Sequence, residues 1–166
     1  IPISEMGGEA LDTGQILEDS HPIRMGDELW FYYSGIDVRH RPNVSKIIDE
    51  YRGGIHLAKL RLDGFVSLRG DSPESFFDTR PLVLHGDRLM INATTETGGS
   101  IRAAITDGYG REVLPGWSAD ACTVIVGDQL EAELQWAGRD LSELAGQRVR
   151  LRFYLNDADL FSFWLE

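Results

Sequence analysis

The residues best suited to proton transfer or to hydrogen bonding with a ligand lie in the first forty positions. They are the acids Asp12, Glu18 and Asp19, followed by His21, Tyr33 and His40. Carboxylates, imidazoles and phenols are the common general acids and bases of enzymes. No spacing here makes two of the acids converge, so the sequence predicts no catalytic pair, and solvated loop acids are the favoured interpretation.

A hairpin would bring four of these side chains together. If residues 21–23 begin one strand and residues 29–33 return antiparallel to it, the start of the first strand and the end of the second share one rim. That rim gathers Asp19, His21, Tyr33 and His40. We therefore expect a binding surface there, although a surface-loop position is the favoured alternative for each histidine.

The second of these strands is strongly aromatic. Alternation places Trp30 and Tyr32 on one face and Phe31 and Tyr33 on the other, which is typical of a central strand and favours packing over binding. If the chain is a piece of a larger protein, one face has lost its neighbour and forms an apolar patch.

From about residue 81 onward the pattern is that of an antiparallel sheet. Apolar residues alternate with polar ones around 89–93, 101–105, 130–136 and 149–155, and residues 160–165 form a last strand. Gly and Asp pairs between them, including Gly98-Gly99 and Asn156-Asp157, predict turns. The sequence thus predicts an all-β protein with an antiparallel, jelly-roll-like β-sandwich.

Helices are expected to be few and short. Residues 44–51 could form two turns, and residues 140–146 could form one turn with Asp140 as its cap. We expect two regions, a set of strands over residues 1–70 and a sandwich over residues 71–166.

The charge of the chain bears on its partners. Sixteen Lys and Arg against 27 Asp and Glu give a formal net charge of -11, which repels nucleic acids and anionic membranes. No run approaches the roughly 20 apolar residues of a membrane span. We expect neither nucleic acid nor membrane as a partner.

The remaining reactive residues favour structural roles. Cys122, the single cysteine, sits in an apolar run and is expected in the core. Asp107, Asp128 and Asp157 in turns leave calcium possible, but no cofactor or metal site is predicted. The stripe Arg148, Arg150 and Arg152 is expected to pair across strands with acids such as Glu131 and Glu133.

Two segments together resemble a known family. The run GDELWFYYSG at 26–35, followed by GIHLAKLRLDGFVSL at 54–68, resembles the last blade and exit strand of a five-bladed β-propeller glycoside hydrolase, fructosidase-like or arabinosidase-like. The segment GRDLSELAG at 138–146, leading into VRLRF at 149–153, resembles the C-terminal β-sandwich that many of these enzymes carry.

The resemblance implies a non-catalytic C-terminal portion of a glycoside hydrolase. Such enzymes carry their two carboxylates on earlier blades, which are not in this sequence, so we expect this chain alone to be inactive. The rim would border the sugar pocket of the parent propeller. Missing blades or a second copy would cover the exposed N-terminal strands, and the absence of an initiating Met fits a shortened chain.

Two tryptophans of the sandwich are expected to have different roles, one in the core and one in ligand contact. Trp136 is in register with Leu130, Ala132 and Leu134 and is predicted to lie in the core. Trp117 lies in a turn-rich stretch and is the candidate for a carbohydrate contact.

Two alternatives stay open. One is a free-standing carbohydrate-binding sandwich, and the other is a structural module without a ligand. The compartment is unknown, with an extracytoplasmic location favoured.

Overall fold

The computed structural model describes residues 10–17, 21–38, 52–73 and 75–166. Contacts divide the chain into unit 1, Ile1–Leu62, and unit 2, Asp63–Glu166. The predicted boundary between residues 70 and 71 lies C-terminal to this division. The reason is that Leu68–Gly70 form strand β5, which pairs with strand β10 (Arg148–Leu165) of unit 2.

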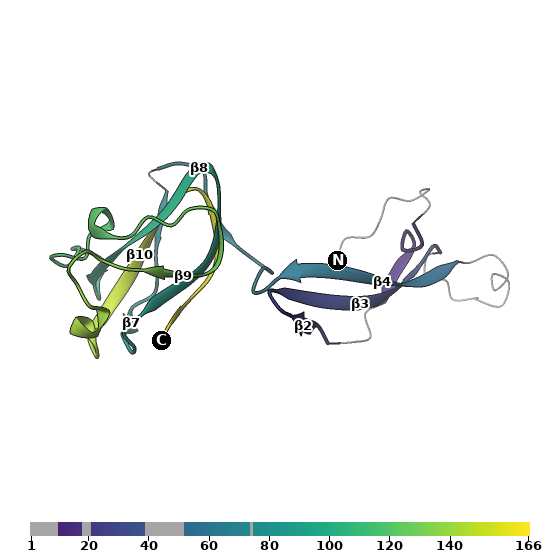
Figure 1. The fold of residues 1–166 in the computed structure, drawn as a ribbon, viewed down its shortest axis with the longest axis horizontal. Coiled ribbons are helices and arrows are strands. Elements are labelled where there is room, and N and C mark those ends of the chain that lie inside the picture. The colour runs from purple at the N-terminus through teal and green to yellow at the C-terminus, as the bar shows by residue number, and fades with distance from the viewer. Residues whose placement is uncertain (1–9, 18–20, 39–51, 74) are drawn as a thin grey trace. The chain divides into compact units, whose positions relative to one another are not determined.

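Unit 1 is a sheet with β3 (Glu28–Ile36) at its centre. Strands β1 (Gln15–Leu17) and β2 (Ile23–Met25) pair with β3 at its two ends, and β4 (Gly53–Arg61) pairs along its whole length. All pairs are antiparallel, and Figure 1 shows β2, β3 and β4 side by side. The alternation predicted for β3 is confirmed, since Tyr33 is buried and Tyr32 is exposed.

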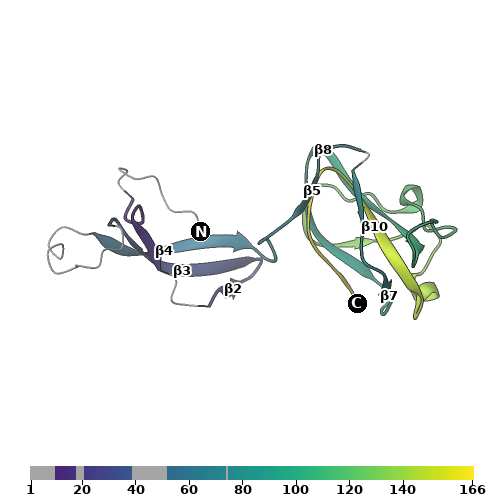
Figure 2. The same cartoon turned by 180° about the vertical axis from the view of Figure 1, so that it is seen from behind.

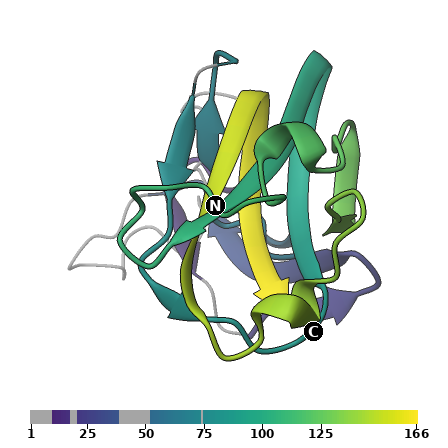
Figure 3. The same ribbon diagram turned by 90° about the vertical axis from the view of Figure 1, so that its left-hand side faces the viewer.

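Unit 2 is organised by two long strands. Strand β8 (Leu89–Asp107) runs antiparallel to β10 from the pair Leu89 and Leu165 to the pair Asp107 and Val149. Both strands curve, as Figure 3 shows with β10 in yellow. They form the continuous centre of the sandwich-like unit.

Shorter strands flank this pair. The outer edge of β10 pairs with β5, β6 (Phe76–Asp78) and β7 (Leu82–Val83), and Figure 2 shows β5 and β7 beside it. The outer edge of β8 pairs with β9 (Asp128–Leu134).

Two predicted turns are wrong. Gly98-Gly99 and Asn156-Asp157 lie inside β8 and β10, where the register shifts between Asn156 and Ala158. A Cβ on Gly99 would lie 2.4 Å from the carbonyl oxygen of Asp157, so the strands pass too closely here for any side chain. Positive φ angles at Gly98 and Asp157 bend the strands without ending them.

Helical structure is limited to short 3-10 turns. These are η2 (Ala119–Ala121) and η3 (Leu141–Leu144), and η3 confirms the single capped turn predicted over residues 140–146. The helix predicted over residues 44–51 lies outside the described residues. Within the described part of the chain, no helix has the length and apolar character to span a membrane.

The core of unit 2 is continuous. Phe153 lies near its centre, with its ring 5.2 Å from that of Phe77 and 5.3 Å from that of Phe163. Ile91 and Ile105, predicted to point inward, are fully buried. The predicted fold class, all-β with antiparallel strands in a sandwich-like arrangement, is confirmed.

Candidate functional site

The predicted rim is described only in part. His21 is exposed just before β2, whereas Asp19 and His40 lie outside the described residues. Strand β2 begins opposite Trp30, and the phenol of Tyr33 is buried further along β3. The four-residue rim therefore stays a prediction, and Tyr33 belongs to a different cluster.

That cluster joins Tyr33 to Asp12 and His56. The Tyr33 hydroxyl donates to Oδ2 of the buried Asp12 carboxylate at 2.9 Å, and its ring stacks on His56 at 5.2 Å. Burial, followed by the hydrogen bond to the Asp12 carboxylate and its charge, raises the pKa of Tyr33. Nε2 of His56 is buried and has no hydrogen-bond partner among the described residues.

This cluster has no room for a ligand at its centre. A Cβ on Gly35 would lie 2.5 Å from Cβ of Asp12 and 2.9 Å from Nε2 of His56. The three side chains therefore pack tightly around the glycine. Their arrangement fixes the segment before β1 onto the sheet.

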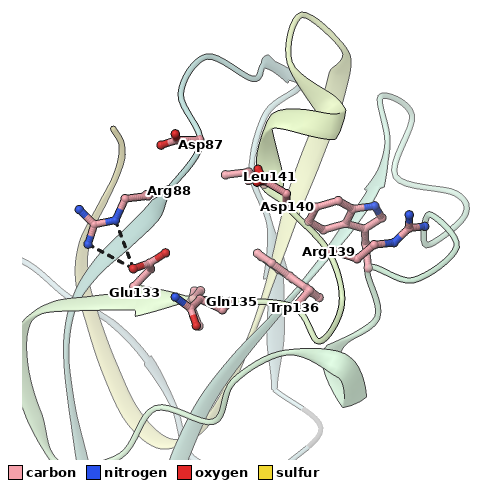
Figure 4. A pocket seen from close by; sticks show the side chains of 10 residues that line it. Asp87, Arg88, Glu133, Gln135, Trp136, Arg139, Asp140 and Leu141 are labelled. Carbon is pink, nitrogen blue, oxygen red and sulfur yellow. Dashed lines mark hydrogen bonds and ion pairs between the residues drawn. The ribbon is translucent and has the colours of Figure 1, made fainter.

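Unit 2 contains a larger open site, a pocket of about 420 Å³ beside η3 (Figure 4). Its charged and polar lining consists of Asp87, Arg88, Glu133, Gln135, Arg139 and Asp140. Its apolar lining consists of Trp117, Leu134, Trp136 and Leu141.

Three segments position these side chains. Asp87 and Arg88 precede β8, and Glu133 lies at the end of β9, which continues into Gln135. Pairing of β8 with β9, including Met90 opposite Glu133, brings these two segments together. The third segment leads into η3.

The start of η3 is fixed by a capping box. Oδ1 of Asp140 accepts a hydrogen bond from the Ser142 backbone N–H at 2.9 Å. The Asp140 N–H donates a hydrogen bond to Oε1 of Glu143 at 3.1 Å. The Ser142 hydroxyl also donates a hydrogen bond to Asp140, and this bond, followed by the one from the Ser142 backbone N–H, lowers the pKa of the Asp140 carboxyl. The rim of the pocket beside Leu141 is therefore held in place.

Both guanidinium groups of the pocket are occupied. Arg88 lies 3.2 Å from Oε2 of Glu133 and 2.8 Å from Oε2 of Glu166. Figure 4 shows the pair of Arg88 and Glu133 on one side of the opening, with Arg139, Asp140 and Leu141 on the other.

Arg139 is held even more closely. It donates to Oε2 of Glu143 at 2.8 Å and to the Pro115 carbonyl oxygen at 2.5 Å, and its guanidinium lies over the Trp117 ring at 5.7 Å. A Cβ on Gly116 would lie 2.4 Å from Nε of Arg139. Glycine at position 116 is therefore part of the geometry of this side of the pocket.

Two tryptophans, Trp117 and Trp136, line the pocket and pack against each other. Trp136 is 4% exposed, which confirms the prediction of a core residue, and its ring centre lies 5.3 Å from that of Trp117. Trp117, predicted to contact carbohydrate, is only 2% exposed, so it offers a ligand very little of its surface. Nε1 of Trp136 has no partner among the described residues.

The predicted pairing of the arginine stripe is confirmed for Arg152, which pairs with an acid on a neighbouring strand, but Glu133 is not a partner of the stripe. Arg152 pairs with Asp78, Arg150 donates to the carbonyl oxygens of Gly108 and Thr79, and Glu133 pairs with Arg88. The physical reason is strand order. The neighbours of β10 are β8 and β5 to β7, so β9, which carries Glu131 and Glu133, is not beside it.

The calcium candidates do not converge. Oδ1 of Asp107 accepts from the Arg111 backbone N–H at 2.8 Å, and backbone hydrogen bonds lower the pKa of this carboxyl. In the described ranges, no group of three or more potential metal ligands occurs. The buried thiol of Cys122 lies in the core, as predicted, and burial raises its pKa to about 11.

The sequence pointed to residues around the N-terminal hairpin and to Trp117 and missed the polar lining of the sandwich pocket. The capping pattern of Asp140 and Glu143 was the one local signal for it. Comparison with known proteins finds no matching family model, no matching curated protein and no matching solved structure.

Proposed function

We propose that this chain is the non-catalytic C-terminal portion of a larger, glycoside hydrolase-like protein. In this proposal, unit 1 packs against a neighbouring sheet of the same protein that lies outside these residues. Unit 2 stabilises that assembly and contacts carbohydrate. The observation that carries the proposal is an open apolar face on the sheet of unit 1.

The register of the strands defines this face. Ile55 on β4 lies opposite Ser34, which lies opposite Leu17 on β1, and Leu57 lies opposite Tyr32. Directly opposed residues share one face of a sheet. Ile55 is 81% exposed, and the other apolar side chains of the face are exposed as well.

The face extends to β2. Lys59 and Ile23 both lie opposite Trp30, and Met25 lies opposite Glu28. Nζ of Lys59 sits over the Trp30 ring at 4.4 Å and 3.4 Å from Oε2 of Glu28. We define the apolar face as Leu17, Ile23, Met25, Tyr32, Ile55 and Leu57.

The opposite face is covered at one end, around Tyr33 and Gly35, and is partly buried along the rest of β3. The segment before β1 lies against Tyr33 and Gly35, and Asp12 and Thr13 within it are buried. A contiguous exposed apolar patch on a soluble protein commonly marks a surface that packs against another protein surface. Packing of that face against another sheet would supply the missing burial, which is the situation of a blade in a propeller.

The alternative is a free-standing carbohydrate-binding or structural sandwich. It is favoured by the continuous core of unit 2, in which residues such as Ile91, Ile105 and Phe153 are fully buried. The two functions differ in what they require of unit 1. A free-standing module has no need for an open face there.

The first experiment compares the 166-residue chain with the variant Ile55→Lys/Leu57→Lys in binding of the dye 8-anilinonaphthalene-1-sulfonate. We expect strong dye fluorescence from the wild type and a marked loss in the variant. Val124→Lys/Val126→Lys, at exposed positions of unit 2, is the matched control and should behave like the wild type. Equal dye binding by all three proteins would contradict the proposal.

The second experiment uses the intact gene product, whose mass is measured beside that of this chain. A longer product should bind less dye and hydrolyse neutral glycosides that the 166-residue chain leaves intact. Hydrolysis by this chain would exclude a non-catalytic role. A stable dimer that excludes the dye would show that a second copy, instead of a neighbouring sheet, covers the face.

A further inference from the structure

We propose that the pocket beside η3 is a binding site for a neutral, hydroxyl-rich sugar. This inference rests on the carbohydrate-contacting part of the proposed function, and it names the site and the ligand class. The pocket volume of about 420 Å³ falls within the roughly 300–1,000 Å³ of small-molecule sites.

The free polar groups of the pocket are mainly acceptors. The side chains of Asp87 and Gln135 are exposed and bond to no other side chain among the described residues. Sugar hydroxyls donate hydrogen bonds, and hydrogen bonds to charged groups are the stronger ones. The Asp87 carboxylate is therefore the expected main contact, with the Gln135 amide as a second.

The charges of the pocket disfavour an anionic ligand. Arg88 is bonded to Glu133 and Glu166, and Arg139 is bonded to Glu143 and the Pro115 carbonyl oxygen. Among the described residues that line the pocket, no guanidinium is left to neutralise an added carboxylate or phosphate. Uronic acids and phosphorylated sugars would instead meet the unpaired Asp87 carboxylate.

A cation is disfavoured by geometry. Glu133 already has Arg88 as its counter-ion, and Oδ1 of Asp140 accepts two bonds from Ser142. The carboxylates stand around the opening and do not converge on one point (Figure 4), and the described residues hold no group of three potential metal ligands. Polar groups spread around an apolar floor match a ring whose hydroxyls lie on its perimeter.

The floor is apolar and preformed. Leu134, Trp136 and Leu141 are buried side chains that line the pocket. Only 3–6% of each residue is exposed, so the floor contributes a small apolar area, against which a C–H edge of a sugar ring can lie while its hydroxyls reach the polar rim. The fixed positions of Arg139 and Asp140 lower the cost of ordering the site.

The test is an NMR titration of the full 166-residue chain with neutral tetrasaccharides of glucose, xylose, arabinose and fructose at millimolar concentration. Galacturonate and glucosamine tetrasaccharides are the charged comparison probes. The readouts are the side-chain amide signals of Gln135 and the indole N–H signal of Trp136. We expect one or more of the neutral sugars to shift both.

Two variants assign the binding to the pocket. Gln135→Ala should weaken binding about 2- to 10-fold, and Asp87→Ala should weaken it about 10-fold or more, from the usual strengths of neutral and charged hydrogen bonds. Both positions are exposed, so the fold should be kept. Asp120→Ala, on an exposed residue outside the pocket lining, is the matched control and should leave the affinity unchanged.

Three results would overturn the inference: no binding of any neutral sugar, equal affinity in wild type and both pocket variants, or binding of the charged sugars alone. None of these results depends on the apolar face of unit 1. A failed titration together with a successful dye experiment would reject the pocket and leave the rest of the proposed function standing.

Discussion

Arg152 holds the carboxylate of Asp78 in a two-point ion pair. Its Nε lies 2.6 Å from Oδ1 and its Nη2 lies 2.8 Å from Oδ2, and both side chains are largely buried. The pair joins the central strand β10 to the short edge strand β6. Parallel bonds of this kind are among the strongest polar contacts in proteins.

Asp78→Ala should reduce the free energy of unfolding by about 1–3 kcal/mol, because it leaves the largely buried Arg152 guanidinium without its counter-ion. Urea denaturation measures the loss. Asp120→Ala is the control, since the Asp120 side chain is 95% exposed and lies 3.4 Å from Arg102, so little change is expected. Equal losses in the two variants would contradict a special role for the buried pair.

The same pair should make stability depend on pH. The hydrogen bond from Arg152 lowers the pKa of Asp78 in the folded state, so its stabilisation is present above the unfolded pKa of about 3.9 and is lost as the pH falls through the folded value. The gap in unfolding free energy between wild type and Asp78→Asn should therefore be constant near pH 7 and shrink below about pH 4. Denaturation curves from pH 7 to pH 3 measure it, and a gap unchanged at pH 3 would argue against the lowered pKa.

Gly116→Ala should destabilise unit 2 more than Gly138→Ala. Both glycines have positive φ, which costs an alanine about 1–2 kcal/mol, but only the Cβ at position 116 would displace the Arg139 guanidinium from its bonds to Glu143 and Pro115. At position 138, no atom of the described residues beyond the two chain neighbours lies within 4 Å of the added carbon. Thermal unfolding measures the difference in stability between the two variants. That difference should disappear when each glycine change is made separately in an Arg139→Ala background.

Cys122 should react slowly in the folded protein. Burial raises its pKa to about 11, so about one thiol in a thousand is ionised at pH 8, and the thiolate is the reactive form. Labelling with 5,5′-dithiobis(2-nitrobenzoate) at pH 8 should be slow in buffer and fast in guanidinium chloride. Fast labelling of the folded protein would show that the thiol is accessible.

Local patterns in the sequence predicted the faces of the strands. The alternation at Leu89, Ile91 and Ala93 identified side chains that are fully buried in the structure. The pair Gly98-Gly99 indicates a turn by its sequence alone, but a glycine with positive φ serves equally well in a turn and in a bend within a strand. Only the pairing of the two long strands distinguishes these cases.

The polar contacts depended on information that no local pattern contains. The partner of Arg152 is set by the order of strands in the sheet, which places β6 and not β9 beside β10. The sandwich pocket likewise combines Asp87, Glu133 and Asp140 from three separate segments. Residue types alone could not bring these segments together.

The pairing of β8 with β10 also determines when the sandwich can form during synthesis. Leu89 finds its partner only at Leu165, and β5, β6 and β7 pair with β10 as well. Contacts so distant in sequence form slowly. Strands β5 to β8 therefore leave the ribosome before their partner β10 is synthesised. Their apolar sides stay exposed to water until β10 emerges and pairs with them.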